Sequence, residues 1–299
     1  MVINSSPDAH PSSLTTTFEK RDTWTVICKE AGPLAGGFCF GEGPRWHDGA
    51  LWFSDMLGAA VHTVDLTGHM TTIPLPGRAP SGLGFAPDGA LLIVSTEDRQ
   101  VLRYADGEVS TLADLAALVP ANLGDMVVDD AGRIYVGAQA RTDGVVVRVD
   151  PDGAASVVAS GLDFPNGMVI TPDGTTLVVA ESTSRRLRAF TLSDGELSGA
   201  RIFADELDGP PDGLAIDADG GFWTALTLAH RFDRITDGGT VTDRVALGDR
   251  VAIAGALGGP DDRTLFLLSS TSAYPEQLIG TAQSRVDVLD VTHPAPQKA

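Results

Sequence analysis

The sequence PNGMVITPDGTTLVVAES, residues 165–182, holds two apolar runs, Met168–Ile170 and Leu177–Ala180, on either side of Asp173-Gly174. An Asp-Gly pair between two β-rich runs is among the strongest signals for a hairpin. We therefore predict two antiparallel strands joined by a turn at Asp173-Gly174. A second pair of the turn type, Asn166-Gly167, precedes the first run, but no strand lies close before it for a turn to connect.

The same order of apolar run, turn and second run recurs five more times. The other copies are GEGPRWHDGALWFSDM (41–56), PSGLGFAPDGALLIVST (80–96), LGDMVVDDAGRIYVGAQ (123–139), PDGLAIDADGGFWTALT (211–227) and AGALGGPDDRTLFLLSS (254–270). They follow one another at intervals of roughly 40 to 46 residues, which is the length of one propeller blade. The repeat predicts an all-β fold, a six-bladed β-propeller with four-stranded antiparallel blades.

Alternating apolar and polar residues within each interval predict the outer strands of the blades. A closed ring also needs its ends fastened, and TWTVICKE (Thr23–Glu30) is a lone N-terminal strand placed to close the last blade beside RVDVLDV (Arg285–Val291). We expect the propeller to span residues 23–291, with flexible tails at residues 1–22 and 292–299.

Charge and cysteine content limit the partners. The chain has 40 acidic and 21 basic residues, a formal charge of −19, which would repel nucleic acids and anionic membrane surfaces. Its two cysteines, Cys28 and Cys39, are too few for a disulfide framework. No segment has the apolar length of a signal-peptide core or a membrane span. We expect a cytoplasmic protein, a monomer or weak homo-oligomer, that acts on a small molecule.

Equivalent positions in the repeat identify candidate site residues. The residue eight places before the turn glycine is Ser81, Gly124, Asn166 and Asp212 in the second to fifth copies; the equivalent position is Ala254 in the sixth copy, and Glu42 in the first copy if one residue is missing there. We call these positions the six slots. Innermost strands line the channel of a propeller, so the slots should form a ring around one mouth of it. Three slots carry oxygen acceptors, and two of these are carboxylates that repel each other unless a proton or cation lies between them.

The oxygen-bearing slots predict one bound divalent cation. Carboxylate and amide oxygens suit Ca²⁺, our first expectation, or Mg²⁺, whereas Zn²⁺, Mn²⁺ or Fe²⁺ would more often recruit His. Taken singly, Asn166-Gly167 and Asp212-Gly213 are better explained as turns. Ser81, Gly124 and Ala254 show, however, that the slot itself requires no oxygen. The shared register therefore favours Glu42, Asn166 and Asp212 as metal ligands.

At these residues the chain resembles the family of senescence marker protein, gluconolactonase and luciferin-regenerating enzyme, which has diisopropylfluorophosphatase as a more distant relative. The matching segments are GEGPRW with Glu42, GDMVVDDAGRIYVG with Asp125, FPNGMVITPDGTTLVVAES with Asn166 and Glu181, PDGLAIDADGGFW with Asp212, and GALGGPDDRTLFLL. The resemblance implies a six-bladed propeller with one catalytic divalent metal on the residues matching Glu42, Asn166 and Asp212. It also implies hydrolysis of sugar lactones, other lactones or organophosphates.

The chain departs from this family's pattern around the substrate. Many members have Asn followed by Asp where this chain has Gly124-Asp125, so an Asn that contacts substrate or metal is absent; Asn122 is a candidate to replace it. Leu57 stands where many relatives carry His. The segment GAQARTDG (137–144) lacks the aromatic and glycine residues frequent there. We expect Asn122, Gly124, Leu57 and Glu181 to shape the substrate side, and the substrate to be less polar than an ordinary sugar lactone.

The expected function is a metal-dependent hydrolase acting on a lactone or related ester. Asp212 is the candidate general base, and Asp125 is a competing base or an orienting group. No G-x-S-x-G elbow is present, so a serine hydrolase is disfavoured. Two alternatives stay open: a metal-dependent biosynthetic enzyme that cyclises, rearranges or cleaves its substrate, and a non-catalytic propeller that binds partners.

Overall fold

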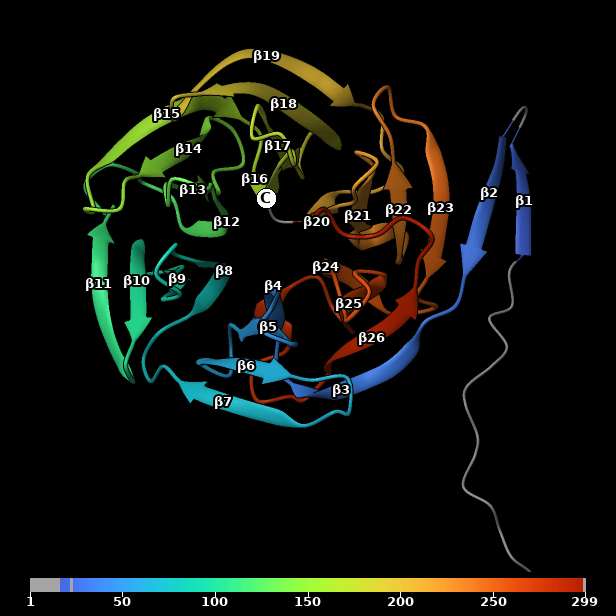
Figure 1. The fold of residues 1–299 in the computed structure, drawn as a ribbon, viewed down its shortest axis with the longest axis horizontal. Helices are drawn as coiled ribbons and strands as arrows, with labels where there is room; N and C mark the ends of the chain where they lie inside the picture. Colours follow the sequence, from blue (N-terminus) through green and yellow to red (C-terminus); the bar gives the residue numbers. More distant parts are fainter. Residues whose placement is uncertain (1–16, 22–23, 298–299) are drawn as a thin grey trace, which may run out of the picture.

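The computed structural model describes residues 17–21 and 24–297. These residues form a ring of six blades with four antiparallel strands each, and two further strands extend the sheet of one blade (Figure 1). The inner strands are β4 (Gly41–His47), β8 (Pro80–Phe85), β12 (Leu123–Val128), β16 (Pro165–Ile170), β20 (Pro211–Ile216) and β24 (Val251–Gly258). The second strands are β5 (Ala50–Asp55), β9 (Leu91–Ser95), β13 (Ile134–Ala138), β17 (Thr176–Glu181), β21 (Phe222–Leu226) and β25 (Thr264–Ser270). The prediction of a six-bladed propeller is confirmed.

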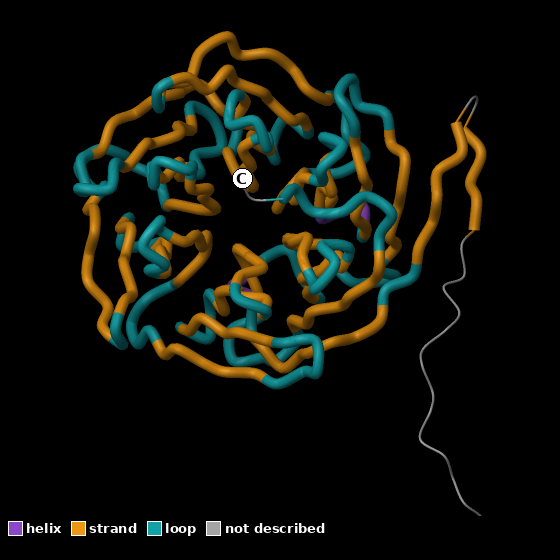
Figure 2. Tube along the Cα trace, viewed as in Figure 1, coloured by secondary structure: helices purple, strands orange, loops and turns teal. Residues whose placement is uncertain are grey.

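The outer half of each blade completes the sheets. The third strands are β6 (Ala60–Val64), β10 (Gln100–Ala105), β14 (Gly144–Val149), β18 (Arg186–Ser193), β22 (Arg231–Ile235) and β26 (Ser284–Asp290). The outermost strands are β7 (Met70–Pro74), β11 (Glu108–Asp114), β15 (Ala155–Leu162), β19 (Glu196–Ala204), β23 (Val241–Ala246) and β3 (Gly32–Phe38). The described residues add two short 3-10 turns, η1 (Thr227–Ala229) and η2 (Pro275–Gln277), and Figure 2 shows mostly short loops between the strands.

A strand from the N-terminal part closes the last blade, as expected, but it is not the predicted segment. β3 pairs with β26, with Phe38 opposite Ser284, whereas β2 (Trp24–Lys29) runs parallel to β23 at the outer edge of blade five. β1 (Thr17–Arg21) pairs with β2, and Figure 1 shows this hairpin outside the ring. The placement of Thr23–Glu30 in the last blade is therefore wrong. The rest of the expected tail of residues 1–22 lies outside the described residues.

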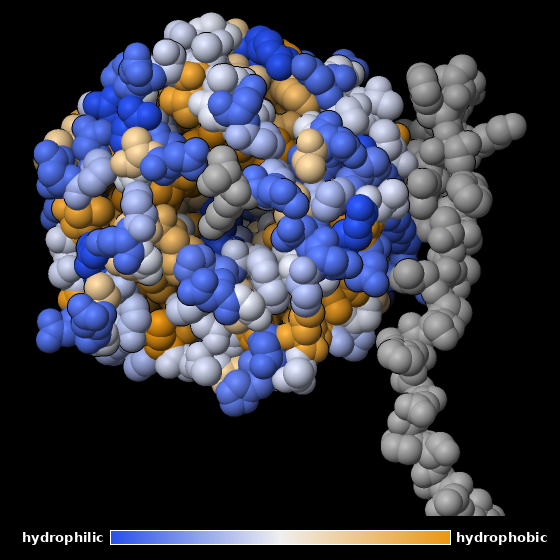
Figure 3. All heavy atoms as spheres, in the orientation of Figure 1, coloured by the Kyte–Doolittle hydropathy of each residue, from blue (hydrophilic) through white to orange (hydrophobic). Residues whose placement is uncertain are grey.

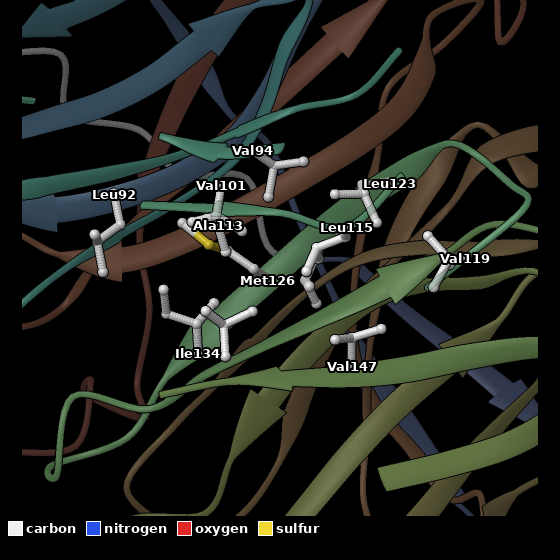
Figure 4. Close-up of a cluster of buried hydrophobic side chains, with 13 residues drawn as sticks. Leu92, Val94, Val101, Ala113, Leu115, Val119, Leu123, Met126, Ile134 and Val147 are labelled. Atoms are coloured by element: carbon white, nitrogen blue, oxygen red, sulfur yellow. The ribbon is translucent and has the colours of Figure 1, made fainter. Parts of the chain in front are cut away.

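The hydrophobic core is divided into slabs, one between each pair of neighbouring blades. In the slab between blades two and three, Leu92 and Val94 of β9 face Met126 of β12 and Ile134 of β13 (Figure 4). The other five slabs join the remaining neighbours in the same way. Because each sheet buries both faces against its neighbours, the inner strands are held in fixed positions around the channel.

The last described residues lie against the propeller at one end of the channel. Ala295 N donates to Asp262 O at 2.6 Å, and Ala218 N donates to Pro294 O at 2.8 Å. Ala295 and Pro296 border a cavity of about 340 Å³ at this end of the channel, lined by later residues of the inner strands such as Val127 and Ile216. Figure 3 shows this face, with hydrophobic residues beside the central hollow. The slots lie at the other end of the inner strands.

Candidate functional site

A one-residue bulge marks the slot in every blade. In β16 the pairing with β17 shifts between Pro165 and Met168, so Asn166 and Gly167 stand out of the regular register. The inner strands of the other five blades shift by the same amount beside their slots. Bulges redirect side chains and recur beside active sites. The repeat therefore places six bulges in one layer around the channel mouth.

Glycines beside the slots let the inner strands approach one another closely. A Cβ on Gly167 would lie 2.4 Å from Asp212 O, and one on Gly213 would lie 2.4 Å from the Cβ of Ala254. In blade two a Cβ on Gly82 would lie 2.6 Å from Met126 N. The glycine of Asn166-Gly167 is thus required by contact between strands and makes no turn. By contrast, Gly174 has a φ of +70° and open space around it, which confirms the predicted hairpin turn.

The two carboxylate slots are buried and close enough to oppose each other's charge. Glu42 and Asp212 are each 8% exposed. Burial, with the carboxylates of Asp212 and Asp125, raises the pKa of Glu42 well above its ordinary value. Burial and the Asp125 charge raise the pKa of Asp212 to about 8, although a hydrogen bond from Asn166 acts in the opposite direction. The charged forms of Glu42 and Asp212 are therefore disfavoured in this position, and a bound proton or cation would relieve the repulsion.

Asp125 differs from the other carboxylates because it has a cationic partner. Arg45 of β4 reaches across the channel and donates from Nη2 to Asp125 Oδ1 at 3.0 Å and to Met126 O. Met126 N donates to the same Asp125 oxygen at 2.8 Å. These bonds fix the Asp125 carboxylate beside Glu42 and Asp212, which agrees with an orienting role better than with proton transfer.

Gln139 occupies the space that a side chain at slot 124 would take. A Cβ on Gly124 would lie 2.2 Å from Gln139 Nε2. That Nε2 group donates to Asn166 Oδ1 at 3.2 Å, while Asn166 Nδ2 donates to Ser182 Oγ at 3.3 Å. Gln139, the residue that follows β13, therefore places its side-chain amide where Gly124 has no side chain. Sequence reasoning identified the segment 137–144 but not this residue; counting the hairpin register from the turn would have placed it beside slot 124.

The other expected substrate residues lie in different surroundings. Asn122 is exposed, and its carbonyl accepts a hydrogen bond from Gln139 N at 2.8 Å. Leu57 is half-buried and packs on an apolar cluster that contains Ala254. Glu181 is fully buried and its carboxylate accepts hydrogen bonds from Arg186, Arg188 and the backbone N of Asp163. Glu181 therefore anchors the segment that leads to Asn166, and its role toward substrate stays a prediction.

The donor set fits a hard divalent cation. Among the described residues, no three His, Cys, Asp or Glu side chains are grouped closely enough to hold an ion by themselves. The candidate set instead combines two carboxylates with the amide oxygen of Asn166. The charge of Arg45 offsets only part of the rise in the pKa of Glu42, and no ion pair of Glu42 or Asp212 is present among the described residues. A divalent ion would stabilise both carboxylates, and oxygen ligands suit Ca²⁺ or Mg²⁺.

Residues 40–271 match the family described as the SMP-30/Gluconolactonase/LRE-like region. The chain belongs to this family. A pentonolactonase from Haloferax volcanii is 27% identical over 77% of this chain and 81% of its own length. A 6-deoxy-6-sulfogluconolactonase from Pseudomonas putida is 29% identical over 77% of this chain and 83% of its own length. The expected family membership is confirmed.

Solved structures of the SMP-30/Gluconolactonase/LRE-like family share the fold. A regucalcin from Agrobacterium tumefaciens, described as a calcium-binding protein, superimposes with a TM-score of 0.71 at 25% identity, covering 89% of this chain and 98% of that one. A putative gluconolactonase superimposes with a TM-score of 0.73 at 21% identity, covering 90% and 94%. No described helix of this family member is long and apolar enough to cross a bilayer.

Proposed function

We propose that this protein hydrolyses a lactone with the help of one divalent cation held by Glu42, Asn166 and Asp212. The observation that carries the proposal is the pair of buried carboxylates with raised pKa values at the channel mouth, in a chain whose relatives include named lactonases. Calcium is the cation we expect first, because the ligands are oxygens and a regucalcin structure is described as calcium-binding.

A cation held by Glu42, Asn166 and Asp212 would polarise the ester carbonyl and would stabilise the negative charge that develops on its oxygen. Asp212 accepts a proton as the oxygen of a water molecule bonds to the carbonyl carbon. The ring C–O bond then breaks, and the same proton passes to the ring oxygen, so that a hydroxy acid leaves. Asp125, fixed by Arg45 and Met126 N, orients the water. Gln139 holds Asn166 in place.

The test combines metal analysis with a panel of lactones. We expect stoichiometric divalent ion in the purified protein, loss of turnover on chelation, and acid release from at least one sugar, aliphatic or aromatic lactone. Glu42→Ala and Asp212→Ala should each abolish metal-dependent turnover in a folded protein. Glu97→Gln is a matched control, because Glu97 is an exposed carboxylate in a loop on the same face. Full activity in either alanine variant would remove the mechanism.

A further inference from the structure

One loop at the channel mouth is much longer than its five counterparts. Second and third strands are joined at this end by residues 56–59, 96–99, 139–143, 182–185 and 227–230, whereas blade six uses residues 271–283. The blade-six loop is thus about three times as long as the others. Long connections inside a compact repeat fold usually carry function rather than simply link strands.

The blade-six loop is held firmly against the mouth. Leu278 is 3% exposed and packs with Phe40 and Ile253. Thr281 O accepts a hydrogen bond from Cys39 Sγ at 2.9 Å, and Gln283 O accepts one from Arg250 Nη2 at 2.7 Å. The loop is therefore anchored at several points.

The apolar cluster under this loop adjoins the candidate cation site. Besides Phe40, Ile253 and Leu278 it contains Val251 and Ala254, with half-buried Met56, Leu57 and Ala273 against it. The six slabs of the core lie between blades, but this cluster lies at the mouth. Ala254 is the slot of blade six, so it stands between the slots of Glu42 in blade one and Asp212 in blade five. One side of the cation site is consequently apolar.

The loop also exposes large apolar side chains at this mouth. Ile279 is 70% exposed and Tyr274 is 54% exposed, the highest values among the large hydrophobic side chains described, together with Leu228 of the neighbouring blade-five loop at 54%. An apolar ligand group that covers Tyr274 and Ile279 removes this apolar area from water and gains binding free energy.

We propose that the blade-six loop binds an apolar substituent of the substrate, so that the substrate is a lactone whose ring carries an alkyl or aryl group rather than several hydroxyls. This inference rests on the proposed lactonase function. The ester carbonyl lies toward Glu42 and Asp212, and the substituent lies along Leu57, Tyr274 and Ile279.

The test uses a matched series of lactones with one ring size and alkyl chains of increasing length, beside hydroxylated lactones of the same ring. We expect kcat/KM to rise roughly fourfold for each of the first added methylenes. Alkyl lactams of the same ring resist hydrolysis, and their affinity, measured by calorimetry, should rise with chain length in parallel. The double variant Tyr274→Ser/Ile279→Ser should flatten both slopes. Ile202→Ser, at a 44% exposed residue of outer strand β19, should keep them.

Each outcome decides one point. Slopes that fall in the double variant and persist in Ile202→Ser support the inference. Hydrolysis of hydroxylated lactones without any gain from alkyl chains overturns the inference and leaves the lactonase function standing. Tighter binding of longer lactams with no hydrolysis of any lactone overturns the proposed function while apolar recognition survives. Slopes unchanged in the double variant overturn the assignment to this loop.

Discussion

Two glycines seven positions apart, Gly167 and Gly174, offer a sharp test of how the mouth is built. Alanine at Gly167 would place its Cβ 2.4 Å from Asp212 O and 2.7 Å from Leu214 N, whereas ordinary contact begins near 3.4 Å. The facing strands β16 and β20 must then separate by about 1 Å, and the proposed ligands Asn166 and Asp212 move with them. Alanine at Gly174 meets no atom within 4 Å.

Stability alone will not separate the two variants. Overpacking at Gly167 should cost about 1–3 kcal/mol of unfolding free energy. Forcing an L-residue to the positive φ of Gly174 should cost about 1–2 kcal/mol. The distinction lies in the site, because a misplacement of about 1 Å can reduce the rate about 100-fold. We expect Gly167→Ala to lose kcat/KM and cation affinity on this scale, and Gly174→Ala to keep both.

The assay measures denaturation midpoints, cation affinity by calorimetry, and kcat/KM for lactone hydrolysis, with wild type and both variants side by side. A Gly167→Ala protein that matches Gly174→Ala in all three would refute the reasoning that close strand approach positions the ligands. Loss of affinity in both variants to the same degree would also contradict it, since Gly174 lies in a hairpin turn outside the slot layer.

Three further outcomes follow from contacts at the mouth and beside it. Gln139→Ala removes the donor to Asn166 and should weaken cation affinity about 2- to 12-fold by calorimetry; unchanged affinity would exclude a positioning role. Glu181→Gln leaves Arg186 without its buried partner and should cost about 3–5 kcal/mol in chemical denaturation, with cation affinity kept; a stable variant that binds the ion weakly would reverse this assignment. In metal-free protein the raised pKa of Asp212 means that the folded state binds a proton more tightly than the unfolded state. Stability should therefore fall as pH rises from about 4 to about 8 and level off above that, and saturating cation should reduce the fall in thermal midpoint; a flat pH profile without metal would count against it.

The sequence predicted the fold well because its signal is repeated. The hairpin at Asp173-Gly174 and its five counterparts fix blade number and strand order through local turn chemistry. The closing strand was misplaced because β3, GPLAGGF, is rich in glycine and proline, whereas TWTVICKE has stronger β-propensity. What places β3 in blade six is pairing with β26, far away in the sequence.

Only part of the candidate site could be predicted from the sequence, because some of its contacts depend on residues far apart in the chain. Register alone placed Glu42, Asn166 and Asp212 in one layer. The contact of Gln139 with Asn166 depends on a side chain that fills a space left by Gly124, and the partnership of Arg45 with Asp125 spans the channel from β4 to β12. Neither contact can be predicted from β-propensity or from the period of the repeat, because both contacts join residues of different blades.

The pairing of β3 with β26 sets the order in which the site can come into existence during synthesis. Blade six needs strands from both ends of the propeller, so the ring cannot shut before β26 has emerged from the ribosome. Glu42 and Asp212 lie in the blades on either side of this last blade, and nothing holds them opposite each other until it forms. If the proposed cation site is correct, an unfinished chain would be unable to bind the ion, and cation binding would indicate that folding is complete.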